Sequence, residues 1–391
     1  MVCEGLLRTL KTLSCVPRGI CFWLLICSGA AVAEQNPFID PEDGAVDLSS
    51  WLLDRKGFLP VPIIITEPAV SYGGGLALMF INESIGDAVA SGRETGHIVP
   101  PDIYGAAAFG TENGTKGAAA GGMVNFLDDR YRWRGGVAHI DANLDFYGKG
   151  QVLGSEDAHI GYNLEGFASQ QEGMWRIGDS NTWLVGRWVY LDFDSTFDLP
   201  ESLTRLSDSE LQSRSSGLGF SVETDARDNI FTPNRGWTGS IDATFYDPDW
   251  GSDERFSAYR AHIFAYYPLT PDWIFGGRLD SRLVDGDAPF YQLPFIDLRG
   301  VPAARYQDEK TGIAETEVRW NATQRWALVG FVGAGRAWGS VDDFSEAESI
   351  INKGGGFRYL IARALGLYVG LDYARGGEDE AFYIQVGNGW R

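Results

Sequence analysis

The chain has 391 residues, of which 53 are acidic and 32 basic, and the resulting net charge of −21 argues against nucleic acid as a partner. Its 50 glycines, 13 tryptophans, 16 tyrosines and 22 phenylalanines favour strands, tight turns and aromatic side chains at a membrane interface. Beyond residue 33 no apolar run reaches the length of a membrane-spanning helix, so helical spans are excluded there.

The amino-terminal segment has the pattern of a secretory signal peptide. Three basic residues precede an apolar stretch over 19–33, which ends in the small-residue sequence Ala31-Val32-Ala33. We expect cleavage before Glu34. The alternative is a retained membrane segment, but the apolar core has about 15 residues where a spanning helix needs about 20. All four cysteines lie within residues 1–33, so the exported chain would carry neither a disulfide nor a thiolate metal site.

Residues 34–56 are polar and acidic, and we expect them to form a short periplasmic segment before a barrel domain at 57–391. Over that domain, apolar residues recur at every second position, which suits one face to lipid and the other to a wet interior. We predict an all-β fold, a transmembrane antiparallel β-barrel of about sixteen strands at roughly 22 residues per strand and connection, although fourteen or eighteen would also fit. The strand-like runs lie at 57–62, 73–80, 102–111, 116–126, 131–142, 159–170, 183–193, 217–225, 237–246, 259–267, 273–283, 355–359, 365–374 and 382–387.

Charged residues fall on one face of these runs. Arg278, Asp280 and Arg282 alternate with Leu279 and Leu283. A basic residue on the lipid face costs about 2–4 kcal/mol at the bilayer midplane, so the charged face is predicted to line a polar lumen.

A turn signature separates the runs at 217–225 and 237–246. Pro233 fixes φ, Gly236 tolerates turn geometry, and Asp228 and Asn229 can bond neighbouring backbone groups. The signature comprises Asp225, Arg227, Asp228, Asn229, Pro233 and Gly236.

With the motifs that follow it, this signature resembles the BamA/TamA superfamily of outer-membrane surface antigens, which includes the D15-like proteins. Leu298-Arg299-Gly300-Val301 is similar to the motif at the tip of the family's sixth surface loop. The runs at 312–319 and 326–338 are similar to the family's next two strands. The resemblance is specific over 220–391 and looser over 57–219. It implies a surface loop folded into the lumen, where an arginine pairs with acidic strand residues.

Carried over to this chain, the resemblance pairs Arg299 with Glu315 or Glu317, while Gly300 allows a close backbone turn. Glu315, Glu317 and Arg319 share one strand face because they are two residues apart. We expect all three to belong to the pinning set, the strand residues that hold the loop inside the lumen. The alternative is an ordinary surface salt bridge.

Four departures from the family pattern limit the transfer. Val301 replaces the loop motif's aromatic residue, and Gly333 stands where many members carry aspartate. Residues 34–56 leave no room for a periplasmic POTRA domain, so we expect a barrel-only member. The chain closes on Arg391 in place of phenylalanine, and the expected carboxyl-terminal insertion signal consists of Phe382, Ile384, Val386 and Trp390.

We therefore expect a barrel that translocates or assembles protein or lipid at the Gram-negative outer membrane, through a weak seam between its first and last strands. Glycines at 73–75, 387 and 389 are consistent with weak pairing there; the alternative is that they only ease the curvature of the strands. The expected partners are outer-membrane lipid, lipopolysaccharide, a periplasmic protein supplying the missing domains, and the barrel-assembly machinery that inserts the chain itself.

Two alternatives stay open. The first is a passive pore or structural barrel, which the absence of periplasmic domains favours. The second is a surface enzyme, which would need His139 or His262 beside a serine and an acid. No histidine falls in a metal-ligand spacing and no nucleophile motif occurs, so we expect no enzyme, no metal and no cofactor.

Overall fold

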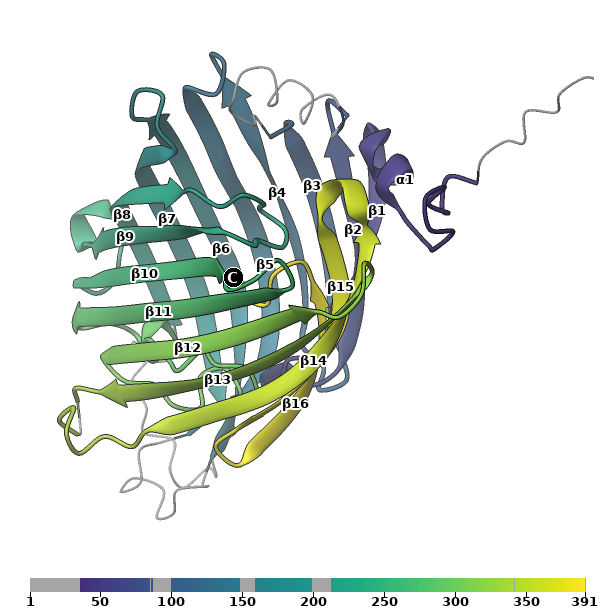
Figure 1. Ribbon diagram of the computed structural model, residues 1–391. Coiled ribbons are helices and arrows are strands. Elements are labelled where there is room, and N and C mark those ends of the chain that lie inside the picture. Colours follow the sequence, from purple (N-terminus) through teal and green to yellow (C-terminus); the bar gives the residue numbers. More distant parts are fainter. Residues whose placement is uncertain are drawn as a thin grey trace, which may run out of the picture. The chain divides into compact units, whose positions relative to one another are not determined.

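The strands pair antiparallel and strictly in chain order (Figure 1). The computed structural model describes residues 36–84, 86, 100–147, 159–198, 212–340 and 342–390, so the expected signal segment with its cysteines, His97 and Arg391 lie outside the described residues. The prediction of an all-β, 16-stranded antiparallel barrel is confirmed. The strands are β1 (Gly57–Ile65), β2 (Gly73–Ile81), β3 (Ile103–Thr111), β4 (Lys116–Phe126), β5 (Tyr131–Phe146), β6 (Ile160–Arg176), β7 (Thr182–Phe197), β8 (Gln212–Asp225), β9 (Gly236–Tyr246), β10 (Phe256–Pro268), β11 (Trp273–Gly286), β12 (Lys310–Asn321), β13 (Trp326–Trp338), β14 (Ile350–Ala362), β15 (Leu367–Gly376) and β16 (Asp379–Val386).

Strand positions follow the alternating runs, with two differences. β5, β6 and β7 have 16, 17 and 16 residues, more than the about 9–11 that cross a bilayer, so these strands extend beyond the membrane. Leu365, expected in a strand, ends the 3-10 helix η4 (Arg363–Leu365) instead. Gly366 follows with a φ of +61°, a conformation that suits glycine and turns the chain into β15.

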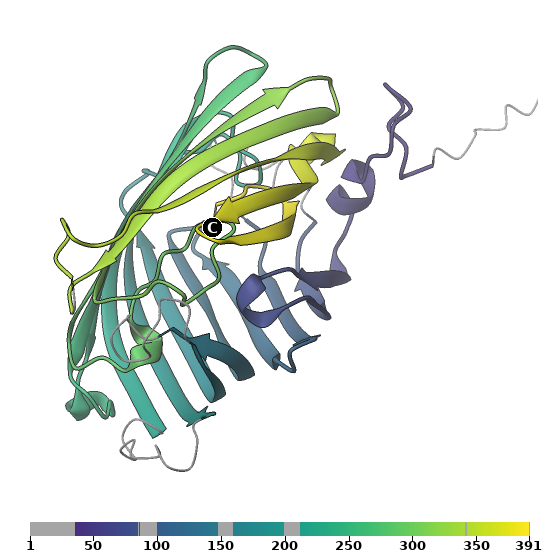
Figure 2. The same cartoon turned by 90° about the horizontal axis from the view of Figure 1, so that it is seen from below.

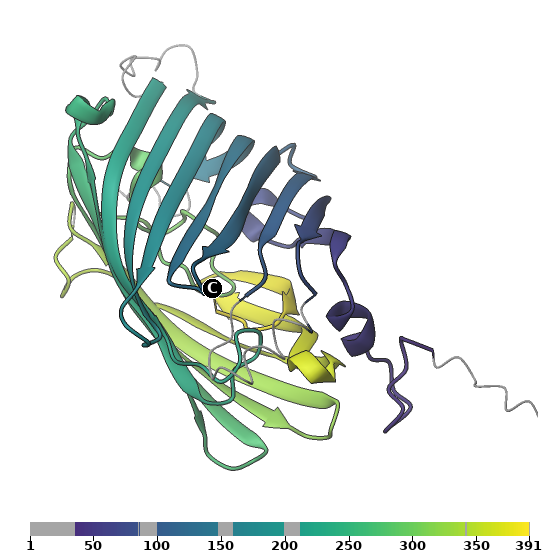
Figure 3. The same ribbon diagram turned by 90° about the horizontal axis from the view of Figure 1, so that it is seen from above.

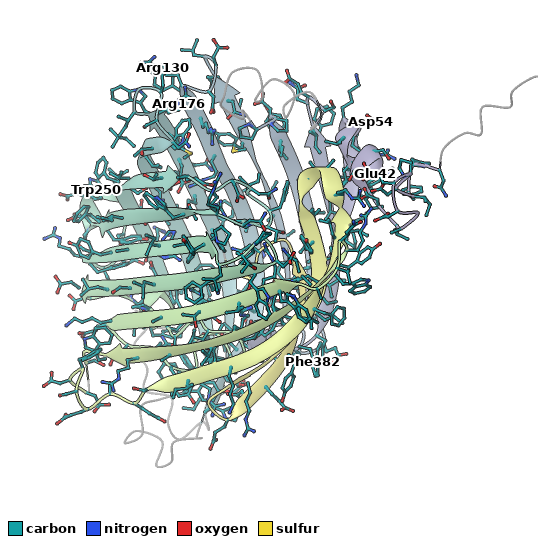
Figure 4. The ribbon with its side chains drawn as sticks, viewed as in Figure 1. Glu42, Asp54, Arg130, Arg176, Trp250 and Phe382 are labelled. Atoms are coloured by element: carbon teal, nitrogen blue, oxygen red, sulfur yellow. The ribbon has the colours of Figure 1, made fainter. Side chains whose placement is uncertain are left out.

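Alternation along each strand separates an outer from an inner face. On β10, Tyr259 and Ile263 are 38% and 39% exposed, whereas Phe264 on the other face is 4% exposed. Trp273 and Trp320 pair across β11 and β12 with their rings stacked at 5.5 Å. Phe382 on β16 is 56% exposed on the outer side of the sheet (Figure 4). The outer face is thus the apolar, aromatic one that lipid requires.

The two edges of the sheet, β1 and β16, share no backbone ladder among the described residues. Pro60 and Pro62 lie opposite Leu78 and Leu76 of β2, and neither proline has an N–H to donate. Alternate residues point their N–H groups to the same edge, so the ladder with β2 is complete only if both prolines face the free edge. That edge therefore lacks two donors for pairing with β16.

The glycines expected at the seam lie elsewhere. Gly73, Gly74 and Gly75 belong to β2 and pair with β1 on one side and β3 on the other. Gly387 follows β16 with a φ of +78°, and the chain turns there toward the inside of the curved sheet (Figures 2 and 3). Proline in β1, rather than glycine in β2, is the feature that limits pairing at the seam.

The segment that precedes β1 binds to turns between the later strands. Arg325, between β12 and β13, donates to Asp40, Asp43 and Asp47 at 2.5, 2.6 and 2.6 Å. Leu48 donates its N–H to the carbonyl of Ile361 at 2.6 Å. This segment, with the helix α1 (Ser49–Leu53), carries Glu42 and Asp54, labelled in Figure 4. Among the described residues, no helix is long and apolar enough to cross a membrane.

Candidate functional site: a buried loop and an arginine-lined lumen

The signature turn, residues 226–235, is built by side chains that bond the backbone. Asp228 accepts the N–H groups of Asn234 and Arg235 at 3.0 and 3.1 Å, and Asn229 accepts those of Phe231 and Thr232 at 2.7 and 2.9 Å. These bonds satisfy donors that a tight turn leaves unpaired.

The turn is closed at its base and tied to a neighbouring turn. Arg227 donates a hydrogen bond to the carboxylate of Asp225 at 2.6 Å, and Pro233 is fully buried. Gly236 has a φ of +101°, and a Cβ there would lie 2.1 Å from the carbonyl oxygen of Ala226. Asn229 donates to the carbonyl of Leu365 at 2.8 Å, which links this turn to the one between β14 and β15.

The connection between β11 and β12, residues 287–309, folds into the barrel. Ile296, Leu298 and Val301 are at most 4% exposed and pack with Ile313 of β12 and Ile350 of β14. The loop therefore has its own apolar core against the barrel wall. Val301, where the family motif has an aromatic residue, is part of that core.

Arg299 lies at the tip of this loop among three carboxylates. It donates to Glu315 at 3.1 Å, to Glu317 at 2.8 Å and to Asp372 of β15 at 3.2 Å. Its guanidinium also lies 3.5 Å from the ring centroid of Phe331. Arg299 is 8% exposed, so these charge-assisted bonds form largely out of water.

Gly300 allows this close approach for two reasons. Its φ is +86°, and a Cβ there would lie 2.8 Å from the backbone nitrogen of Gly376 on β15. Its own N–H donates to the hydroxyl of Tyr383 on β16 at 2.9 Å. The loop tip is therefore in contact with the last two strands.

The pinning set differs from the predicted one. Arg319, 7% exposed, donates to the carbonyl of Pro233 at 3.2 Å and to Asn234, so it bonds the signature turn and not the loop. Asp372 and Asn352 take its place, and sequence reasoning did not assign either of them to the site. Asn352 donates to the carbonyl of Arg299 and to Glu315, both at 3.1 Å.

Gly333 explains why Asn352 fits. The two residues pair across β13 and β14, and a Cβ at position 333 would lie 2.6 Å from the side-chain oxygen of Asn352 and 3.0 Å from Cβ of Glu315. An aspartate at 333, as in many family members, would compete for this space. This chain supplies an acid from Asp372 instead.

The carboxyl-terminal residues divide between the two faces. Phe382, Ile384 and Val386 are 56%, 38% and 60% exposed on the outer face. Trp390 is 5% exposed inside the barrel, where its indole N–H donates to Glu315 at 2.6 Å and its ring packs near Tyr266 at 5.7 Å. Trp390 thus shares Glu315 with the loop arginine, a placement that nothing in the sequence indicated.

A cavity of about 820 Å³ lies in the lumen beside the loop and Trp390. Glu172, 2% exposed, accepts from Arg134 at 2.5 Å and from Arg187 at 2.6 Å, and Asp280 accepts from Arg260 at 2.9 Å. Its charged lining consists of Arg134, Arg187, Arg227, Arg260, Arg282, Glu172, Glu223 and Asp242. These ion pairs hold the guanidinium groups in fixed orientations.

One histidine in this cavity lies beside a serine and an acid. His262 Nδ1 is 3.1 Å from Ser240 Oγ, and the Ser240 hydroxyl donates to Asp242. In a catalytic triad the acid bonds the histidine, whereas here it bonds the serine, so the serine is not set up as a nucleophile. His139 lies 3.9 Å from Glu165, and both side chains are exposed. In the part of the chain that the structure describes, no cluster of His, Cys, Asp or Glu is arranged to hold a metal.

Comparisons with known protein families and solved structures agree with the barrel fold. Residues 172–297 match the Omp85 superfamily domain, and no curated protein matches the sequence. BamA from Haemophilus ducreyi lacking POTRA domains 1–3 shares 12% identity at a TM-score of 0.58, over 85% of this chain and 70% of that one.

Two CdiB structures are also similar. CdiB from Acinetobacter baumannii shares 12% identity at a TM-score of 0.55, over 84% of this chain and 59% of that one. CdiB from Escherichia coli shares 10% identity at a TM-score of 0.57, over 84% and 61%. This chain spans about three-fifths of each CdiB chain, and at such identities the likeness shows the fold. The chain thus contains a segment, residues 172–297, that matches the Omp85 superfamily domain, and it forms a transmembrane barrel similar in fold to BamA.

Proposed function

We propose that this barrel translocates or assembles protein or lipid at the Gram-negative outer membrane, and that the seam between β1 and β16 is its opening. The observation that carries the proposal is the unpaired seam, whose β1 edge lacks donors at Pro60 and Pro62. A barrel selected only for closure would complete this ladder, because unpaired backbone groups cost several kcal/mol in lipid. Residues 1–33 serve in this proposal as the export signal and 34–56 as a periplasmic segment.

The buried loop holds the seam closed by touching both of its sides. On the β1 side, Glu67 in the β1–β2 connection accepts the N–H of Ala303 at 3.1 Å. On the β16 side, Gly300 bonds Tyr383, and Arg305 bonds Asp379. Movement of residues 295–305 would therefore release both edges at once. The proposed partners are outer-membrane lipid, lipopolysaccharide, a periplasmic protein and the machinery that inserts the barrel.

Refolded protein in liposomes provides the test. We expect these liposomes to speed the folding of a urea-unfolded eight-stranded outer-membrane barrel, measured by heat-modifiable gel mobility, relative to empty liposomes. The matched control carries Pro60→Val and Pro62→Val, which restore two donors at the seam and should remove the acceleration. Equal folding rates with wild-type and empty liposomes would refute the assembly role.

The second candidate is a passive pore. The charged cavity of about 820 Å³ favours it, because a polar lumen can hold water and ions. The loop and Trp390 weigh against it, since both occupy the interior. Conductance separates the two functions, because a passive pore conducts steadily with the loop in place.

A further inference from the structure

The inner wall formed by β1 to β4 differs from the rest of the lumen. Residues directly opposite each other in an antiparallel ladder share a face, and Arg134, which lines the cavity, lies opposite Met123 of β4. Met123 in turn lies opposite Ile103 of β3, and Ile103 lies opposite Ile81 of β2, so these residues form one inward-facing row across the strands. From this row, every second residue of β1 to β4 faces inward, and none of these residues is charged. The inward set is Gly57, Leu59, Val61, Ile63, Ile65, Gly73, Gly75, Ala77, Met79, Ile81, Ile103, Gly105, Ala107, Phe109, Thr111, Gly117, Ala119, Gly121, Met123 and Asn125.

Apart from Lys116 at the start of β4, these four strands are apolar on their outer face as well. Phe58, Ile64 and Leu76 are 74%, 56% and 49% exposed toward lipid. A barrel strand between lipid and water alternates apolar and polar residues, as the later strands of this barrel do. The prediction of a polar lumen therefore fails for β1 to β4. The protein itself covers part of this inner face, since Leu59 and Ile81 are 8% and 2% exposed, whereas Ala119 and Gly121 near β5 are exposed. The exposed apolar part is favourable only when something other than water covers it.

The part of the lumen next to this wall offers cations to a ligand. Arg134 donates to Glu172 and Glu223 through Nε and Nη2, and Arg260 donates to Asp280 through the same two nitrogens. Arg187, Arg227 and Arg282 use Nε and Nη2 in the same way. Among the described residues, no acceptor bonds Nη1 of any of the five. Five guanidinium groups are thus held by carboxylates, and each has its Nη1 amino group left to donate to a phosphate oxygen.

The cations and the apolar wall are adjacent. Arg134 and Met123 are direct neighbours in the ladder between β5 and β4, so the wall begins where the cavity ends. At its other limit the wall reaches β1, the unpaired edge of the sheet. We propose that the lumen binds a phospholipid with an anionic headgroup, its phosphate on the cavity arginines and its acyl chains on the inner face of β1 to β4.

The arginines and the apolar wall together favour an anionic phospholipid over other ligands. A free phosphate would use the arginines and leave the exposed part of the wall uncovered, and a zwitterionic phospholipid would present its own cation to the arginines. The site itself stands on the lumen geometry, whereas the route of the lipid through the seam rests on the proposed function.

Native mass spectrometry of the refolded protein in detergent tests the proposal, with phosphatidylglycerol and phosphatidylcholine as probes. We expect one phosphatidylglycerol to be retained and phosphatidylcholine to be lost. Arg134→Gln, which removes a cavity cation, and Ala119→Asp, which adds a carboxylate to the wall, should each weaken retention about tenfold. The matched control is Arg214→Gln, an exposed arginine outside the cavity that also pairs with an aspartate, Asp192.

Heat-modifiable mobility identifies variants that fail to fold, and either folded variant suffices for the comparison. Equal retention of the two lipids, or equal retention of phosphatidylglycerol by the cavity variants and the control, would overturn the proposal. Thermal protection by inorganic phosphate as strong as that by phosphatidylglycerol would also overturn it, in favour of a free-anion site. Lipid is present during refolding in detergent, so its retention does not depend on the seam opening in a membrane. This result is therefore independent of the liposome folding assay, whose failure alone would refute only the transport role.

Discussion

Replacing Arg299 by alanine probes the loop that we propose to hold the seam. The substitution leaves Glu315 and Asp372, 1% and 0% exposed, without one of their donors. Breaking a buried ion pair costs about 3–5 kcal/mol. The lower end applies, because Asp372 keeps Arg358 at 2.6 Å and Glu315 keeps Trp390 at 2.6 Å. We therefore expect a loss of about 3 kcal/mol, and a fall of roughly 5 °C in unfolding temperature for a chain of this length.

The assay is the temperature at which the folded band disappears from a heat-modifiable gel, read at a fixed heating rate because barrels of this kind unfold irreversibly. Arg299→Lys keeps the charge but loses the planar fork, so its unfolding temperature should lie between those of alanine and wild type. Arg336→Ala is the matched control, since its partners Ser349 and Phe344 lie in exposed contacts. An Arg299→Ala protein as heat-resistant as the control would refute the pinned loop.

Three further predictions follow from single contacts. Trp390→Phe keeps the packing but removes the donor to Glu315, and should lower the stability by about 1–3 kcal/mol, measured on the same gel; an unchanged value would mean that the tail is not fixed by this bond. Gly333→Asp should destabilise through its clash with Asn352, and adding Asn352→Ala should recover much of the loss; equal effects in both backgrounds would contradict this account. Hydrogen bonds from Arg325 and the Ala45 N–H hold the pKa of Asp43 well below 3.8, so its contribution is present above that value and lost as pH falls through the folded pKa. Protease cleavage at residues 37–56 should therefore rise in acid, and a flat pH profile would count against the clamp.

The pKa of Glu67, on the β1 side of the seam, is shifted in the opposite direction to that of Asp43. Burial raises the pKa of Glu67, against the hydrogen bond from the Ala303 N–H. Its folded state holds the proton more tightly than the unfolded state does, so stability is greatest below the ordinary carboxyl pKa and falls as pH rises through the folded value. Glu67→Gln should flatten this part of the stability profile, and an unchanged profile would show that another group titrates there.

Much of the barrel followed from local patterns. The run at 237–246 became β9, which begins one residue earlier, because alternate apolar residues there must face lipid on one side. The turn around Asp228 and Asn229 followed from side chains that bond their own backbone, a short-range effect that sequence expresses directly. Arg299, Glu315 and Glu317 came together as the resemblance implied, although their functional role stays a proposal.

The remaining partners depend on register between strands far apart in sequence. Asp372 is 73 residues from Arg299, and Asn352 is placed by its pairing opposite Gly333. The empty volume at Gly333 was the one available signal, since a missing side chain requires a neighbour to fill it. Trp390 lies in the lumen because the chain turns at Gly387, after β16. The alternating pattern of a strand does not predict a turn beyond the strand's end.

Conductance in planar bilayers tests most directly the claim that the loop and the tail close this barrel. Wild-type protein is compared with a variant lacking residues 295–303, with Arg336→Ala as the matched control. The account predicts a wild type and a control that are closed or nearly so, and a large, steady conductance after deletion. A wild type that already conducts as strongly as the deletion variant would contradict it and favour the passive pore.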